Sequence, residues 1–315
     1  MKYSYPLGAW KKIFREFQQV KRVEIDTSDD RLSLLIRSHS APLYVTRQEL
    51  ENIVSKLNCN PKEAATSFLK EHGVIVYYQN TLVGFFDIVG YSSFIPTPTF
   101  AEKIDMVSIF FKQTETLKAN MGRLKIAHWI LSDSVILALD TNHNPLCGET
   151  LKWFLATCSS LMTLGIRSKF PLRGAIGGGD FYKDGEIMVS TALVDAHKYE
   201  KEQDWLGAVL TPNALAIVAK ANRNAPIDLT TNEYKDFVGY RKIPWKKNEW
   251  WKCKKPMDYL PEQTFCLKPY SPPLDWVSYL PDYFDKEGRG REKVANSHCL
   301  YAPVNDGDTA QLAIT

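Results

Sequence analysis

Two short apolar runs, each carrying one aspartate, place the strongest constraint on how this chain can fold. The first is residues 85–92, with Asp87, and the second is residues 131–137, with Asp133. A carboxylate in an apolar strand is costly to bury unless cations or hydrogen-bond donors hold it. A pair of divalent metal ions with a triphosphate above them would do so. The simpler interpretation, that each aspartate only ends or turns a strand, is weaker for Asp133, because apolar residues flank it on both sides.

Length and composition set the broad class of the protein. With 315 residues and 44% hydrophobic content, the chain can form one large domain, or a core domain with an extension. It has no apolar run of 18 residues, and its first ten residues lack the pattern of a signal peptide. Six scattered cysteines form no C-x-x-C pair, which argues against a zinc site and a disulfide framework. We therefore expect a cytoplasmic protein with no membrane partner.

Basic residues are concentrated in one late segment. Lysines alternate with Trp245, Trp250 and Trp251 between residues 242 and 255. Basic residues with interleaved aromatic rings can bind nucleic acid. The favoured alternative is a solvated arm whose tryptophans pack on another surface, such as a partner subunit. Nucleic acid is therefore not the expected partner.

Residues 1–75 are expected to form a helical N-terminal extension. Its clearest helix starts at Asn60, a capping residue, with Pro61 in the first position and Glu63 three residues after the cap. The helix should stop near Gly73.

Residues 76–225 alternate between strand and helix patterns. Their order, β-α-β-β-α-β-α-β-α, predicts an α+β sandwich with an antiparallel-rich sheet and helices packed on it. Three glycines at 177–179 predict a turn. From Pro244 onward, prolines and tryptophans dominate and the periodicity fades, and residues 226–315 are expected to form an extended C-terminal arm and cap. The expected strands are 74–78, 82–88, 125–139, 172–176 and 209–210, and the expected helices are 100–121, 151–164, 191–202 and 212–219.

Two metal-binding aspartates would suit phosphoryl transfer. The attacking and leaving oxygens would lie between two Mg²⁺ or Mn²⁺ ions, for which all-oxygen ligands are suitable. Because this chemistry depends on positioning and charge neutralisation, a cation such as Arg173 should lie nearby. The backbone N–H groups of Gly90, Tyr91 and Ser92 could cradle a phosphate.

Two glycine-rich stretches partly resemble other nucleotide-binding motifs but do not match them. The glycine-rich stretch 174–179 has no G-x-x-x-x-G-K-[ST] around it, so it is not a Walker P-loop. Residues 178–181, Gly-Gly-Asp-Phe, match only part of the GGDEF motif of diguanylate cyclases, and the spacing from Asp87 is too long for that family.

The order of motifs resembles the homology domain of class III nucleotide cyclases over about residues 80–220. Residues 85–92 resemble F-x-D-I-x-G-[FY]-[ST], residues 132–134 a G-D-S hairpin, residues 173–178 R-x-G-I-x-x-G, and residues 190–198 G-x-x-V-N-x-A-x-R. The resemblance implies a class III cyclase-like sandwich. It also implies that Asp87, the carbonyl group of Ile88, and Asp133 hold two metal ions per active site, and that Arg173 binds the phosphates. Such enzymes act as homodimers that share their active sites.

This sequence departs from the family's motifs at the positions that recognise the base and at those that stabilise the transition state. The positions that read a purine hold Trp129 and Ile187. Trp129 could stack on a base or only close the cavity. The usual asparagine and arginine of the later helix become Val194 and Lys198. Lys198 keeps the positive charge expected of a catalytic residue, but not the planar fork of arginine.

Further similarity points to pyrimidine substrates. Residues 192–207 and the run Tyr240–Lys246 resemble the pyrimidine cyclases of bacterial Pycsar anti-phage defence, in which Lys246 would bind phosphate. This implies conversion of CTP or UTP to the 3′,5′-cyclic monophosphate and pyrophosphate, and a separate effector protein that the product activates. The sequence does not choose between CTP and UTP. Two alternatives stay open: an adenylate or guanylate cyclase, and a catalytically silent cyclase-like nucleotide-binding domain.

Overall fold

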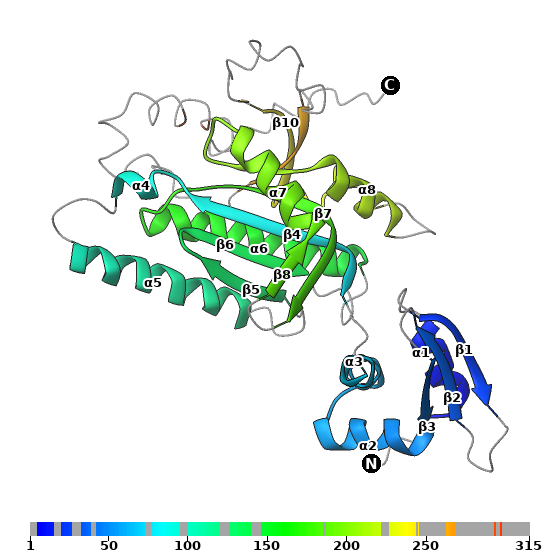
Figure 1. The fold of residues 1–315 in the computed structure, drawn as a ribbon. Helices are drawn as coiled ribbons and strands as arrows, with labels where there is room; N and C mark the ends of the chain where they lie inside the picture. The colour runs from blue at the N-terminus through cyan, green and yellow to red at the C-terminus, as the bar shows by residue number, and fades with distance from the viewer. Residues whose placement is uncertain are drawn as a thin grey trace, which may run out of the picture. The chain divides into compact units, whose positions relative to one another are not determined.

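The chain divides into two compact units, which are Met1–Tyr78 with Tyr182–Ile187, and Gln79–Phe181 with Met188–Thr315. Figure 1 shows the elements of both units. Within the described residues, no helix combines the length and the hydropathy needed to cross a bilayer. The computed structural model describes residues 5–15, 20–26, 33–38, 42–72, 77–94, 100–119, 126–139, 146–184, 187–221, 227–243, 245, 263–268, 293 and 297.

The first unit combines helices with a small antiparallel sheet of order β1-β2-β3. The prediction of a helical extension was therefore wrong for residues 20–26, 33–38 and 42–46. The pattern there has a period of two, because Leu43 and Val45 turn inward while Tyr44 between them is exposed. The elements are α1 (Leu7–Arg15), β1 (Val20–Asp26), β2 (Ser33–Ser38), β3 (Pro42–Thr46), α2 (Arg47–Leu57) and α3 (Pro61–Glu71).

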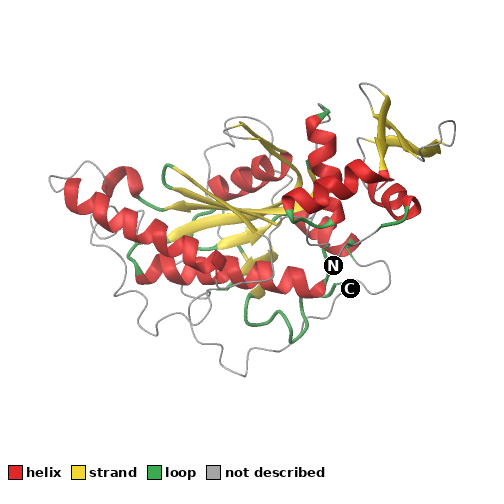
Figure 2. Cartoon of the chain, turned by 90° about the horizontal axis from the view of Figure 1, so that it is seen from below, coloured by secondary structure: helices red, strands yellow, loops and turns green. Residues whose placement is uncertain are grey.

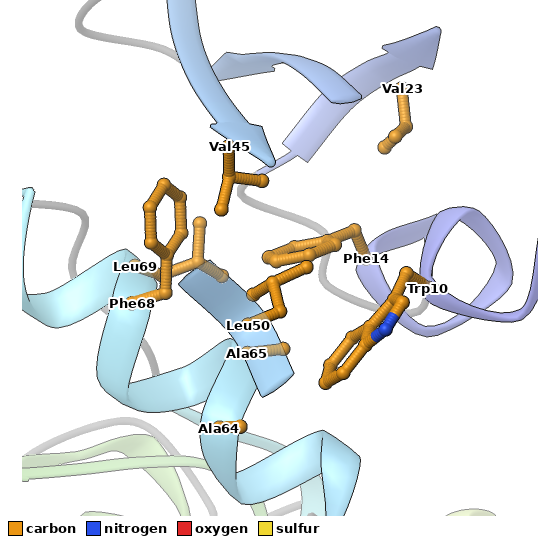
Figure 3. Packing of buried hydrophobic residues seen from close by; sticks show 9 residues of the cluster. All are labelled: Trp10, Phe14, Val23, Val45, Leu50, Ala64, Ala65, Phe68 and Leu69. Atoms are coloured by element: carbon orange, nitrogen blue, oxygen red, sulfur yellow. The ribbon is translucent and has the colours of Figure 1, made fainter. Parts of the chain in front are cut away.

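This first unit has its own apolar core (Figure 3). The predicted start of α3 is confirmed: the Asn60 side chain accepts from the backbone N–H of Glu63 at 2.9 Å, and the Glu63 carboxylate accepts from the N–H of Asn60 at 3.1 Å. The core residues are Trp10, Phe14, Val23, Val45, Leu50, Ala64, Ala65, Phe68 and Leu69.

The second unit is built on a mixed sheet, which confirms the predicted α+β class. Its strand order is β10-β11-β9-β7-β4-β6-β5, with β8 paired to β7. The β7–β9 pair is parallel, whereas β4–β6, β5–β6, β9–β11 and β10–β11 are antiparallel. The strands are β4 (Tyr78–Ile88), β5 (Ile126–Leu131), β6 (Ser134–Leu139), β7 (Leu172–Asp184), β8 (Ile187–Ser190), β9 (Ala208–Leu210), β10 (Val238–Lys242) and β11 (Gln263–Leu267).

Helices cover both faces of this sheet, as Figure 2 shows. A Cβ atom on Gly84 of β4 would lie 3.4 Å from Cys158 of α6, whereas the ring of the next residue, Phe85, packs edge-on against His197 of α7 at 4.9 Å. Because successive residues of a strand point to opposite faces, α6 and α7 lie on opposite sides. The helices are α4 (Tyr91–Phe94), α5 (Phe100–Ala119), α6 (Gly148–Arg167), α7 (Thr191–Glu202) and α8 (Pro212–Lys220).

Two predictions about this unit were wrong. The glycines at 177–179 continue β7 instead of forming a turn. A Cβ atom on Gly177 would come within 2.2 Å of the Ala192 carbonyl of α7, and one on Gly178 within 2.6 Å of the Ala214 amide of α8. The glycines therefore serve close helix packing. In addition, β10 and β11 extend the main sheet, so residues 226–315 do not lie wholly outside it as an arm and cap.

Candidate active site

Asp87 lies at the carboxyl end of β4, on the face of the sheet that α7 covers. It shares this face with Phe85, and its partner across the strand pair is Ser134 of β6. The Ser134 hydroxyl donates a hydrogen bond of 3.0 Å to the Asp87 carboxylate. Asp87 lies near the end of this strand, as the sequence predicts, but it is partly buried and not fully buried.

Asp133 lies in the tight turn between β5 and β6, not at the middle of one long strand as expected. Ser132 before it adopts φ of 58°, the left-handed conformation that a tight hairpin turn requires. The turn packs beside the end of β4, where the Asp133 carbonyl accepts from the Ile88 N–H at 3.1 Å. The hairpin, which the resemblance of residues 132–134 to a G-D-S hairpin implied, thus brings both predicted aspartates to one end of the sheet.

The environment of Asp87 raises the pKa of its carboxyl group from 3.8 to about 6. Burial is the largest cause, followed by the nearby negative charges of Glu200 and Asp133. The hydrogen bond from Ser134 and the positive charge of Arg173 oppose this shift only in part. The negative charges of Glu200 and Asp133 therefore disfavour the ionised form of Asp87, and a bound cation would relieve this repulsion.

Arg173, at the start of β7, is paired with Glu200 of α7. Its Nε donates to Glu200 Oε1 at 2.6 Å, its Nη2 forms an ion pair with the same oxygen, and its Nη1 donates to the backbone carbonyl of Gln203 at 3.4 Å. The Glu200 side chain is 2% exposed and that of Arg173 is 12% exposed. The structure thus places the predicted Arg173 near Asp87, but with a carboxylate partner of its own.

Sequence reasoning missed Glu200. The available signal is its spacing on α7: Ala192, Ala196 and Glu200 follow one another at intervals of four and are all buried. A glutamate on the buried face of a helix needs a cation, which Arg173 supplies from a different element.

The backbone groups expected to cradle a phosphate follow the end of β4, and Trp129, expected near the base, lies on β5. Gly90 has φ of 82°, which allows the chain to turn from β4 into Tyr91 and Ser92, the first residues of the short helix α4. Trp129 of β5 stacks on the buried ring of Phe181, with centroids 5.0 Å apart and planes at 26°. One face of the indole is therefore covered by the protein itself.

The remaining predicted positions are Ile187, Val194, Lys198 and Lys246. Ile187 begins β8 and is 63% exposed, and Val194 on α7 is 69% exposed. Lys198 lies on an exposed part of α7. Lys246 lies outside the described residues, as does most of the segment 242–255.

The residues present are suited to Mg²⁺ or Mn²⁺ as far as the chemistry of their donors goes. Asp87, Asp133 and the carbonyl group of Ile88 would supply only oxygen ligands, which these ions prefer. The raised pKa of Asp87 is the independent sign that its charge lacks full compensation from the protein. Among the described residues, no group of three or more histidine, cysteine, aspartate or glutamate side chains is arranged around a common metal position.

Comparison with known proteins finds similarity only among solved structures. No family model matches the chain, and no curated protein matches it. The similar structures include the catalytic core of a rhodopsin-guanylyl cyclase in complex with ATPαS, at 9% identity and a TM-score of 0.41, with 61% of this chain and 97% of that chain covered. The guanylate cyclase domain of RhGC from Catenaria anguillulae, in complex with GTP, is 10% identical with a TM-score of 0.39, over 62% of this chain and 99% of that chain.

A third similar structure is the adenylyl cyclase CyaB from P. aeruginosa, at 14% identity and a TM-score of 0.36, with 61% of this chain and 95% of that chain covered. All three are described as nucleotide cyclases or as parts of them. Their TM-scores lie below 0.5, so the assignment of a function depends on the residues of the site.

Proposed function

We propose that this protein is a pyrimidine nucleotide cyclase, which converts CTP or UTP to cyclic CMP or cyclic UMP and pyrophosphate. The observation that carries the proposal is the meeting of Asp87 and Asp133 at one end of the sheet, with a raised pKa for Asp87 and with Arg173 beside it. Trp129 and Ile187, at the positions where the related cyclases read a purine, support a pyrimidine substrate.

In the proposed reaction, the 3′-oxygen of the ribose attacks the α-phosphorus of the same nucleotide. A new phosphorus–oxygen bond closes the ring, the bond to the β-phosphate oxygen breaks, pyrophosphate leaves with its electron pair, and the 3′-hydroxyl proton passes to solvent. Two Mg²⁺ or Mn²⁺ ions per site, when bound, would acidify the hydroxyl group and neutralise charge on the phosphates. Asp87, Asp133 and the carbonyl group of Ile88 would hold these ions.

The other residues of the site would position the substrate. Arg173 would bind phosphate oxygens through N–H groups that Glu200 does not use, and the backbone of Gly90, Tyr91 and Ser92 would approach the phosphates from the end of β4. On α7, Lys198 would supply positive charge to the transition state. Lys246 is proposed as a further phosphate ligand on sequence resemblance alone.

The wider role that we propose is that of a cytoplasmic second-messenger synthase of Pycsar anti-phage defence. It would act as a homodimer, and its product would activate a separate effector protein. No membrane and no nucleic acid partner is needed for this role. These points are supported only by the resemblance of residues 192–207 and 240–246 to that family.

The proposed activity can be tested by incubating purified protein with ATP, GTP, CTP or UTP, each separately with Mn²⁺, and identifying products by mass spectrometry. A cyclic pyrimidine nucleotide that is absent with Asp133→Ala supports the proposal and identifies the base. A cyclic purine product would keep the cyclase chemistry but refute our use of Trp129 and Ile187. Triphosphate binding without any cyclic product would favour the silent nucleotide-binding domain.

The shared active site of the proposed homodimer has its own test. Asp87 and Arg173 lie close together in one chain, so the test pairs Asp87 with Lys198 instead. Chains with Asp87→Ala and chains with Lys198→Ala should each lose activity, and their mixture should regain it if one site takes these residues from two chains. A mixture that stays inactive after denaturation and joint refolding, which forces exchange of subunits, would indicate a site formed by one chain.

A further inference from the structure

The carboxylate of Glu200 is an unusual feature of the site, because it is charged, buried and next to other carboxylates. It is 2% exposed, and its charge contributes to the raised pKa of Asp87. A charge so deeply buried is retained at a cost unless a close partner compensates it. Its partner is Arg173, whose Nε and Nη2 both contact Glu200 Oε1.

A second anchor fixes the same guanidinium group. Nη1 of Arg173 donates to the backbone carbonyl of Gln203, at the end of α7. That carbonyl is itself held in place, since the Gln203 side chain donates to the Gly174 carbonyl at 2.7 Å and accepts from the Trp205 indole at 2.6 Å. Gln203 is fully buried, so this anchor is rigid.

The two anchors leave part of the guanidinium group for a ligand. An arginine offers more N–H donors than these contacts use, and its planar fork is fixed once two of its nitrogens are held. His197 also lies near Glu200, with its Nδ1 3.6 Å from Oε2, but this nitrogen makes no hydrogen bond to a described residue. The side-chain hydrogen bond to Glu200 in the described part of the chain therefore comes from Arg173.

We propose that Glu200 is a positioning residue, which orients Arg173 beside Asp87 so that the guanidinium group can receive the phosphates of a nucleoside triphosphate without leaving its carboxylate. This assignment rests on the proposed cyclase function. In this proposal Glu200 touches neither substrate nor metal: it orients Arg173, in addition to the effect of its charge on Asp87.

The test is a double-mutant cycle with Glu200→Gln, Arg173→Gln and the double variant. Rates of cyclic nucleotide formation are measured against the concentration of the triphosphate that the wild-type protein uses, at saturating Mn²⁺. Glu200→Gln keeps the volume of the side chain and an oxygen acceptor but removes its charge. Glu202→Gln, two residues further along α7 and more exposed, is the matched control.

We expect Glu200→Gln to raise the KM for the triphosphate about tenfold, as the loss of one oriented charge-assisted contact does, with a smaller change in kcat. The double variant should have the KM of Arg173→Gln alone, because residues that act as a unit are not additive. A merely structural role would instead lower kcat and the melting temperature at an unchanged KM. Glu200→Asp, which keeps the charge but withdraws it by one methylene group, gives an intermediate KM and serves where Glu200→Gln does not fold.

Two results would overturn the assignment while leaving the cyclase function intact: a KM equal to that of wild type in both Glu200 variants, or an equal further rise of KM when Glu200→Gln is added to Arg173→Gln. No product from the wild-type protein with any triphosphate would overturn the proposed function, and this assignment with it.

Discussion

Replacing Asp87 by asparagine should stabilise the metal-free protein while removing its activity. The reason is that the folded structure disfavours the ionised carboxylate, whose pKa is raised from 3.8 to about 6 by burial and by the charges of Glu200 and Asp133. Asparagine removes the charge but keeps an oxygen that can accept the hydrogen bond from Ser134. The change therefore leaves the packing of the β4 end intact.

The size of this effect follows from the pKa difference between the folded and unfolded states. A difference of about two pKa units corresponds to roughly 3 kcal/mol of unfolding free energy, and screening of the partly exposed Asp87 reduces it to about 1–2 kcal/mol. At pH values well below 3.8 the carboxyl group is protonated in both states, so the advantage of the variant should vanish. It should grow as pH rises from 4 to 6, where the unfolded wild-type chain is ionised and the folded one is not, and stay constant above pH 7.

Chemical denaturation of both proteins between pH 4 and pH 8, in the presence of a chelator, measures this difference. Added Mn²⁺ should reverse the order, because it stabilises only a folded state that still has its ligand. A variant that is less stable than wild type at pH 8, or a difference that does not change with pH, would refute the proposed destabilisation by the Asp87 charge. It would mean that Arg173 outweighs burial and the neighbouring carboxylates.

Three further predictions concern packing, thiol reactivity and capping. Gly177→Ala should destabilise the second unit by about 3 kcal/mol or more in thermal or denaturant unfolding, because the new Cβ would meet the Ala192 carbonyl at 2.2 Å; an unchanged midpoint would refute the close packing of α7. Iodoacetamide should label Cys147 before Cys158. Slight burial raises the pKa of the exposed Cys147 thiol, but hydrogen bonds with Thr150 and with the helix N-terminus outweigh it and lower the pKa, whereas complete burial raises the pKa of Cys158. Mass spectrometry of the labelled native protein would show the reverse order if these environments are wrong. Asn60→Ala should lower the unfolding free energy of the first unit by about 1 kcal/mol through loss of the α3 cap, and Asn60→Asp, which can still cap the helix, should not.

Elements with local signals could be predicted from the sequence. The cap, the proline and the glutamate at the start of α3 act within a few residues, and the starts of α7 and α8 at residues 191 and 212 were equally visible. Asp87 was located correctly for the same reason, since the apolar run before it and Gly90 after it mark the end of a strand.

The errors come from causes that lie far apart in the sequence. The glycines at 177–179 resemble a turn until α7 and α8 are packed on them. Strand β11 becomes part of the sheet through its pairing with β9, where Cys266 lies opposite Val209. The role of Glu200 can be recognised only from its ion pair with Arg173, which is 27 residues away in the sequence. The pairing partners of these residues leave no local pattern, although the spacing of Glu200 on α7 does indicate that it is buried.

The charges at the end of the sheet favour a cation-dependent function over a silent scaffold. Asp87, Asp133 and Glu200 bring three negative charges together, and Arg173, whose positive charge acts on Asp87, is itself held by Glu200. A scaffold would lose nothing if Asp87 became asparagine, because the hydrogen bond from Ser134 would remain and the repulsion would end. Stability is commonly sacrificed in this way where a site needs charge for its chemistry. The carboxylate at position 87 therefore agrees with the cyclase function that we propose, in which Asp87 would hold a cation together with the substrate.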